Sequence, residues 1–142
     1  MKYQKEISAG GIVYKNDGEN TEWLLIQNSS HKGWGFPKGH VGDKVRNETI
    51  DVAALREVKE EGGIEAHIVN KEPIVINYKY RYQNYLIDKT VYYFLMEYQA
   101  GSVQEHDWEI SQAKFASADE VLSTITYKND KQAFEKALLL IK

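Results

Sequence analysis

The sequence predicts an α/β fold in which a mixed β-sheet is covered by helices on both faces. Two observations indicate this class. Runs of strand length, rich in β-branched and aromatic residues, are interspersed with segments whose apolar residues recur at helical spacing. The chain has 142 residues, enough for one domain with a sizeable core. We therefore expect residues 1–142 to form a single domain.

The composition is that of a globular protein and argues against membrane-spanning, disulfide-rich and nucleic-acid-binding proteins. Hydrophobic residues make up 42% of the chain, as in globular proteins, and no apolar run approaches the ~20 residues that span a bilayer. The absence of cysteine excludes a disulfide framework and a thiolate metal site. The N-terminus lacks an apolar segment of signal-peptide length, so we expect a cytoplasmic protein without membrane association. A formal net charge of -3 argues against a stable nucleic-acid complex.

The first elements expected are the two strands of a β-hairpin. They cover residues 6–14 and 22–28, with Asp17 and Gly18 at the bend. Residues 29–43 follow as a loop, because glycines and Pro37 interrupt regular structure there. A long loop between two strong elements is a candidate site.

A helix over residues 48–61 is the clearest element, with Asn47 as its N-cap and Gly62 and Gly63 closing it. At 100° per residue, its two faces differ. We expect an apolar face against the core, formed by Val52, Leu55 and Val58, and an acidic face formed by Glu57, Glu60 and Glu61.

The remainder of the chain predicts three more strand regions and two helices. The strand regions are residues 65–82, divided into two strands at Pro73, residues 89–98 and residues 113–117. The helices are residues 117–124 and 130–141.

The acidic face of residues 48–61 is the first chemical signal. Glu57, Glu60 and Glu61 lie at i, i+3 and i+4, where like charges destabilise a helix by roughly 0.2–0.5 kcal/mol per pair. A hard divalent cation would offset this repulsion, and Mg²⁺ binds a few carboxylates together with substrate phosphates. Arg56 is placed to hold one carboxylate through a charge-assisted pair. The alternative is a solvated helix face without function.

The preceding loop favours the functional interpretation. Its segment WGFPKGH, residues 34–40, combines apolar anchors, a rigid proline and a glycine that allows close approach, with basic groups beside them. Placed just before the acidic helix, these residues predict a pocket for a cation and phosphate groups.

Residues 42–64 resemble the signature of the Nudix (MutT-like) hydrolases. They read Gly42-x5-Glu48-x7-Arg56-Glu57-Val58-x-Glu60-Glu61-x-Gly63-Ile64 and match the full Nudix box. SAGGIVY near the start and FPKGHV in the loop extend the resemblance, which implies a Nudix α/β/α sandwich over essentially the whole chain.

One feature departs from the family pattern. Relatives with an FPKGH loop begin the box at the glycine that matches Gly39, but here Gly39 lies three residues too far from Glu48. Gly42 has the correct spacing. We interpret the difference as a short insertion within residues 41–47. Gly39 is then the structural equivalent of the family's glycine, and the roles of Gly42 and Glu48 stay open.

The resemblance implies a set of metal ligands and catalytic residues. Glu57, Glu60 and Glu61 would bind Mg²⁺, for which Mn²⁺ is a substitute, with help from the backbone carbonyl of Lys38, and Arg56 would orient Glu57. The cation would activate a water that attacks phosphorus, and a carboxylate would take the proton. A further carboxylate often comes from a later loop or strand, for which the candidates are Glu97, Glu105 and Glu109.

Within the family, the chain is most similar to the diadenosine tetraphosphate hydrolases. The segments FPKGHV, KTVYYFLMEY, DWEISQAKF and KNDKQAFEKAL carry this likeness. It implies asymmetric cleavage to ATP and AMP, with adenine stacked on aromatic rings. The expected substrate-binding residues are Lys32, Trp34, Lys38, His40, Tyr82 and Tyr85.

Three other functions remain open at this stage. Two share the chemistry: release of pyrophosphate from a nucleoside triphosphate, and removal of pyrophosphate from an RNA 5′ end. The third is a nucleotide-binding module without catalysis, because a fold alone does not give a function. The complete set Arg56, Glu57, Glu60 and Glu61 argues against that third function. The sequence leaves the oligomeric state open.

Overall fold

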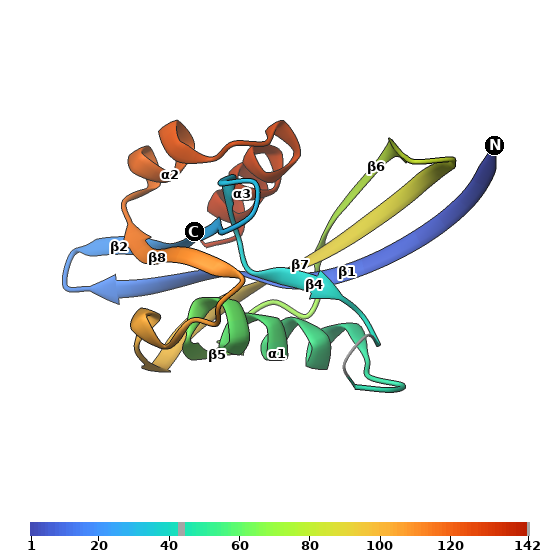
Figure 1. The fold of residues 1–142 in the computed structure, drawn as a ribbon. Coiled ribbons are helices and arrows are strands. Elements are labelled where there is room, and N and C mark those ends of the chain that lie inside the picture. The colour runs from blue at the N-terminus through green and yellow to red at the C-terminus, as the bar shows by residue number, and fades with distance from the viewer. Residues whose placement is uncertain (43–44, 142) are drawn as a thin grey trace.

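The computed structural model describes residues 1–42 and 45–141, which form eight β-strands, three α-helices and one short 3-10 helix (Figure 1). The strands are β1 (Lys2–Asp17), β2 (Asn20–Asn28), β3 (Trp34–Gly35), β4 (Lys38–His40), β5 (Ile64–Ile68), β6 (Ile74–Tyr82), β7 (Tyr85–Gly101) and β8 (Ile110–Ala116). The helices are α1 (Ile50–Gly62), η1 (Val103–Glu105), α2 (Ala118–Thr124) and α3 (Lys128–Leu140). No helix among these residues is long and apolar enough to cross a membrane.

The strands form one mixed sheet between two layers of helices, as the sequence predicts. Strand β1 runs parallel to β7 and antiparallel to β2 and β4. On the far side of β7 lie β5 and β6, and β8 pairs with β2. Helix α1 covers one face of the sheet, and α2 and α3 cover the other (Figure 1).

Both faces of the central strands are buried because their side chains alternate between two apolar clusters. On the side of α3, Ile12, Leu25 and Tyr93 pack with Phe134. On the side of α1, the next residues along the same strands, including Val13, pack with Ala53, Ala54 and Val58. The covered sheet therefore explains why these strands are apolar almost throughout.

Two details of the predicted helix at residues 48–61 are wrong. Helix α1 begins at Ile50 with Thr49 as N-cap, because Asn47 has a left-handed backbone with φ of 62°. Val52 does not face the core, since its side chain is 49% exposed. The buried face is formed instead by Ala53, Ala54, Glu57, Val58, Glu61 and Gly62. The acidic side chains Glu57 and Glu61 are therefore inside the molecule rather than on a solvated face.

The expected loop of residues 29–43 contains two short strands, β3 and β4, and its last residue lies outside the described residues. Strand β4 adds to β1, where Gly10 pairs with Lys38. A Cβ on Gly10 would lie 2.0 Å from the carbonyl oxygen of Pro37. The absence of a side chain there allows the loop to lie directly against the central strand.

One end of the sheet projects beyond the helices as a three-stranded arm (Figure 1). We define the arm as residues 2–7 of β1, 78–82 of β6 and 85–89 of β7, which are joined by the pairings of β7 with its two neighbours. The hairpin between β6 and β7 closes at Tyr82 and Tyr85, and Gln83 in its turn has a φ of 54°.

Helix α3 should contribute strongly to stability through Phe134. Its ring is fully buried and lies 5.0 Å from Trp23 and 5.8 Å from Phe36, measured between ring centroids. We expect Phe134→Ala to lower the free energy of unfolding by about 3–5 kcal/mol in urea titrations. Leu139→Ala, on the same helix but at a side chain that is 72% exposed, should change it by less than about 0.5 kcal/mol. Equal effects would contradict this packing.

Candidate functional site

A single guanidinium organises the acidic residues at and before helix α1. The Nη1 of Arg56 donates to Glu57 at 3.1 Å and to both carboxylate oxygens of Glu60 at 3.2 Å. Its Nε and Nη2 donate to the two oxygens of Glu48 at 3.0 and 2.6 Å, a two-pronged contact. Arg56 thus holds three carboxylates in fixed positions.

Glu48 completes this clamp from the segment before the helix. Its side chain is fully buried and also accepts a hydrogen bond of 3.1 Å from the backbone N–H of Gly42, whose φ is 80°. Hydrogen bonds from Arg56 are the main reason that the pKa of Glu48 is below its usual value. Gly42 and Glu48 therefore serve to position Arg56. Residues 43 and 44 of the expected insertion lie outside the described residues.

Gly39 has a separate role beside Glu57. A Cβ on Gly39 would lie 2.1 Å from one carboxylate oxygen of Glu57, so any other residue there would displace this carboxylate from its position. Gly39 and Gly42 thus act on two different carboxylates: Gly39 leaves room for Glu57, and Gly42 donates to Glu48.

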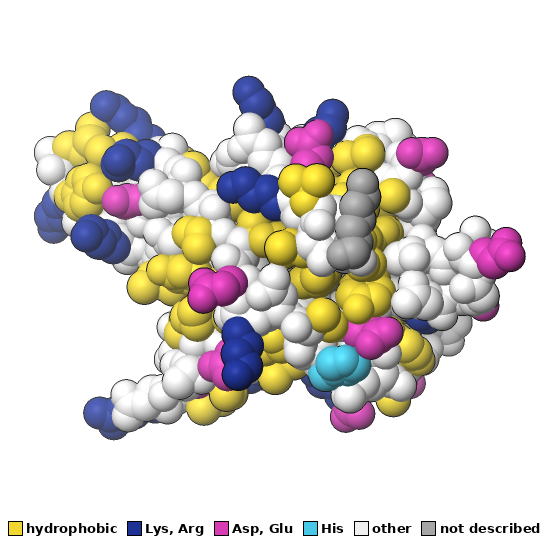
Figure 2. Space-filling model, turned by 180° about the vertical axis from the view of Figure 1, so that it is seen from behind, with side chains coloured by type: hydrophobic (Ala, Val, Ile, Leu, Met, Phe, Trp, Pro, Cys, Tyr) yellow, Lys and Arg dark blue, Asp and Glu magenta, His cyan; other side chains and the backbone are white. Residues whose placement is uncertain are grey.

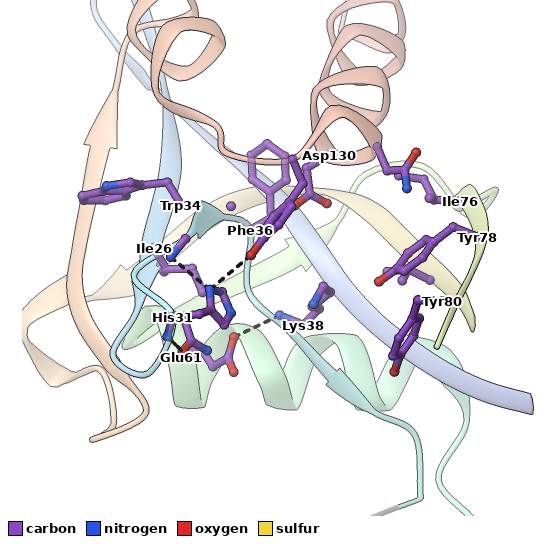
Figure 3. Close-up of a pocket in the computed structure, with 16 residues that line it drawn as sticks. Ile26, His31, Trp34, Phe36, Lys38, Glu61, Ile76, Tyr78, Tyr80 and Asp130 are labelled. Carbon is purple, nitrogen blue, oxygen red and sulfur yellow. Dashed lines mark hydrogen bonds between the residues drawn. The ribbon is translucent and has the colours of Figure 1, made fainter. Parts of the chain in front are cut away.

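Glu61 lies one turn further along α1 and is only 8% exposed. Its Oε1 accepts a hydrogen bond of 3.1 Å from the backbone N–H of Lys38 in β4 (Figure 3). Burial raises the pKa of Glu61 to about 8, and the negative charges of Glu57 and Asp107 act in the same direction. A desolvated carboxyl group among other carboxylates is a position that a cation would stabilise.

The donor set fits a hard divalent cation. It consists of carboxylate oxygens from Glu57, Glu60 and Glu61, the ligand type that Mg²⁺ prefers. Among the described residues, no three such side chains converge in the arrangement of a metal site. Arg56 contacts Glu57 and Glu60, while Glu61 accepts a hydrogen bond from Lys38. These three glutamates are the residues that would hold the cation.

A cavity of about 580 Å³ opens next to Glu61 and Lys38. Figure 3 shows Tyr78 and Tyr80 of β6 on one side of it, His31 on the other and Asp130 of α3 above. The remaining residues that line it include Ile26, Asn28, Phe36, Ile76, Val91, Tyr127 and Asn129. The cavity thus combines aromatic and aliphatic walls with a cation, a carboxyl group and amides at defined positions.

Two charged groups beside the cavity are partly removed from water. Asp130 accepts a hydrogen bond of 2.8 Å from the buried hydroxyl of Tyr93, and burial raises the pKa of this carboxyl group. Lys89 lies on the neighbouring strand, and burial followed by repulsion from Lys38 lowers its pKa to about 8. Lys38 and Lys89 are close enough to repel, so an anion between them would stabilise both.

The predicted substrate-binding residues are in three different places. Lys38 and Trp34 line the cavity, although the ring of Trp34 points away from its centre and lies under the ammonium group of Lys114. Lys32 and His40 are exposed and do not line it. Tyr82 and Tyr85 are at the end of the arm, beyond the residues that line the cavity.

Of the acidic residues proposed from the sequence as a further catalytic group, Glu97 lies near the end of β7, and Glu105 and Glu109 lie between β7 and β8. Glu105 is exposed in η1, Glu109 is half-buried just before β8, and Glu97 contacts His67 at 3.4 Å. The acid of this region that acts on Glu61 is Asp107. Its backbone N–H also donates to the carbonyl oxygen of Glu60 at 2.8 Å, which ties the segment to the end of α1.

Sequence reasoning missed Asp107, and it also missed the contribution of α3 to the cavity. In the sequence, Asp130 begins the expected helix of residues 130–141, and Tyr127 and Asn129 come just before it. All three line the cavity. The one available signal was Asp130 itself, an acidic residue in the first turn of that helix that lies on the same face as Phe134.

Comparison with known proteins agrees with this architecture. The family model described as "NUDIX domain" matches residues 4–137. "Putative mutator protein MutT4" of Mycobacterium tuberculosis is 30% identical over 99% of the chain, and the chain spans 58% of that relative's length. "Putative nudix hydrolase 1" of Caenorhabditis elegans is 44% identical over 43% of the chain and 17% of its own length.

Solved structures share the fold at low sequence identity. An Ap4A hydrolase of C. elegans, in a binary complex, has a TM-score of 0.78 at 23% identity, covering 96% of this chain and 97% of that one. A dihydroneopterin triphosphate pyrophosphohydrolase of E. coli has a TM-score of 0.75 at 20% identity, covering 99% of each chain. The fold, together with the family match across residues 4–137, shows that this chain belongs to the NUDIX family.

Proposed function

We propose that this protein hydrolyses nucleoside polyphosphates and that its substrate is a dinucleoside tetraphosphate, cleaved asymmetrically into ATP and AMP. The observation that carries the proposal is the position of the cavity. Its lining runs from Glu61 and Lys38, next to the carboxylate cluster, to the tyrosines of β6. One ligand would therefore place phosphates at the cluster and a base among aromatic rings.

Different residues of the site would bind the phosphates and the base of the substrate. Lys38 and Lys89, which repel each other, would hold the negatively charged phosphate chain. Tyr78 and Tyr80 present aromatic rings to the cavity, and each base stacked on such a ring contributes about 1–3 kcal/mol. The substrate is thereby held with one phosphate beside α1.

The carboxylates carry the chemical step. Glu57, Glu60 and Glu61 would hold a divalent cation, Mg²⁺ or Mn²⁺, whose chemistry is to neutralise phosphate charge and activate water. Arg56 and Gly42, through Glu48, keep Glu57 and Glu60 in position. As the oxygen of the water bonds to phosphorus, a carboxylate of this cluster would take the proton of the water. The bond from phosphorus to the bridging oxygen would break, and its electron pair would leave with the departing phosphate.

The names of the relatives do not decide the substrate. An Ap4A hydrolase and a dihydroneopterin triphosphate pyrophosphohydrolase both share the fold below 25% identity, and the NUDIX domain of an NrtR from Shewanella oneidensis was solved with ADP ribose. The preference for a dinucleotide rests on the FPKGHV loop and on the tyrosine-rich hairpin that extends the cavity wall. Release of pyrophosphate from a triphosphate or from an RNA 5′ end is the alternative.

Product analysis tests the substrate. With Mg²⁺ and diadenosine tetraphosphate, the purified protein should yield ATP and AMP in equal amounts, as measured by chromatography. A panel of nucleoside triphosphates assayed in parallel should react more slowly. Faster release of pyrophosphate from a triphosphate, without cleavage of the dinucleotide, would keep the phosphoanhydride chemistry and refute the substrate.

The carboxylate cluster is tested by removing charge without changing shape. Glu60→Gln and Glu61→Gln should each lower turnover by about 10²-fold or more while the far-ultraviolet circular dichroism spectrum stays unchanged. Glu65→Gln is the matched control, because the Glu65 side chain is 63% exposed and lies just after the helix. An active Glu60→Gln/Glu61→Gln double variant would refute the assignment.

Binding of the cation should also stabilise the native protein. At a hundredfold excess over its Kd, a ligand that binds the folded state alone adds about 2.7 kcal/mol, which corresponds to a rise of several degrees in Tm. We expect this rise with millimolar Mg²⁺ for the wild-type protein and a smaller one for Glu61→Gln. A wild-type Tm that ignores Mg²⁺ would count against the site.

A further inference from the structure

The tyrosines of β6 form a row that leaves the cavity and continues along the arm. Tyr78, Tyr80 and Tyr82 alternate in sequence and so lie on one face of the strand, where residues two apart are separated by about 7 Å of backbone. The first two line the cavity, with ring centroids 6.0 Å from each other. Tyr82 lies beyond the lining and is 58% exposed. The row of tyrosines therefore continues beyond the residues that line the cavity.

The strands beside β6 complete this face of the arm. Tyr85 is the register partner of Tyr82, and Lys2 is in turn the partner of Tyr85, with its ammonium group 5.9 Å from that ring's centroid. Lys89 pairs with Tyr78 at the cavity end of the same face. An aromatic pair at the tip and a lysine at each end thus occupy one surface.

The arm has a net positive charge, although the chain as a whole is negative. The arm contains five basic and two acidic residues, whereas the formal net charge of the chain is -3. In Figure 2, Lys and Arg side chains surround hydrophobic ones at the left end of the molecule, where the arm projects. On the cavity face, the carboxylate of Glu6 accepts a hydrogen bond of 2.9 Å from Tyr80. Lys5, Lys79 and Arg81 lie on the opposite face of the arm. The tyrosine face thus carries Lys2 and Lys89 against Glu6, a net positive charge that would attract an anionic ligand.

We propose that Tyr82 and Tyr85, together with Lys2, form an outer subsite that stacks the second nucleoside of a dinucleoside polyphosphate. This inference rests on the proposed function and specifies how the far end of that substrate is held. One nucleoside occupies the cavity, the phosphates pass Lys38 and Lys89, and the other base reaches the tip of the arm. Packing between the two rings does not account for a tyrosine that is 58% exposed.

The test compares ligands that differ only in the second nucleoside. The probes are adenosine 5′-tetraphosphate and diadenosine tetraphosphate, both with the same methylene bridges that resist hydrolysis, each titrated calorimetrically in the presence of Mg²⁺. Tyr82→Ala and Tyr85→Ala should weaken binding of the dinucleotide about 5- to 150-fold, the equivalent of ~1–3 kcal/mol per stacked base. Binding of the mononucleotide should change less than about twofold. Tyr82→Phe and Tyr85→Phe should retain binding of both.

Tyr3 offers a matched control on the same arm. It is 55% exposed, and its hydroxyl donates to Asp88, which places it on the opposite face of the strands. Tyr3→Ala should leave binding of both probes unchanged. An equal loss for Tyr3→Ala and Tyr82→Ala would overturn the subsite and indicate a general effect on the arm.

The outcomes separate the subsite from the proposed function. If the wild-type protein cleaves the dinucleotide but Tyr82→Ala and Tyr85→Ala bind both probes normally, the subsite is refuted and the function stands. If the wild-type protein hydrolyses triphosphates alone, yet binds the dinucleotide probe through Tyr82 and Tyr85, the subsite is supported and the proposed substrate is refuted.

Discussion

The structure of the site depends on the guanidinium of Arg56. It contacts carboxylates from a helix and from the segment before it: Glu57 and Glu60 on α1, and Glu48 ahead of the N-cap. Like charges at this spacing repel, and a half-buried position strengthens the repulsion. Arg56 balances part of this charge, and Glu48, held by the backbone of Gly42, fixes the direction in which Arg56 points.

A second constraint is the close approach of β4, β1 and α1 to one another beside the acidic residues. Gly39 of β4 leaves room for Glu57, and Gly10 of β1 leaves room for the carbonyl oxygen of Pro37. The small side chains of Ala53 and Ala54 face the sheet, so helix α1 and its glutamates lie close to the strands. The acidic side chains are consequently removed from water, which is why burial is the main influence on the pKa of Glu61.

The sequence predicted the layers and the acidic helix because both depend on local periodicity and on a well-defined motif. The predicted start of α1, with Asn47 as N-cap, was wrong. Contacts of Glu48 with Arg56 and Gly42 override the local preference of Asn47 for that position. The prediction for Val52 was wrong because the buried side of the helix is centred on Ala53, Ala54 and Val58, which leaves Val52 49% exposed. Asp130 and Asp107 were missed because their roles arise from chain segments far apart in the sequence, which a local pattern does not bring together.

The arm also has a consequence for how separate copies of the protein meet. Strand β6 pairs with β7 and with no other strand among the described residues, so its outer edge presents backbone groups that another extended chain can bind. Such edges invite aggregation, and natural proteins protect them with charged side chains. Lys79 and Arg81 lie on this edge strand and alternate with the tyrosines. The same short sequence thus keeps a ring-bearing surface available to ligands while the like charges of two approaching edges hold the molecules apart.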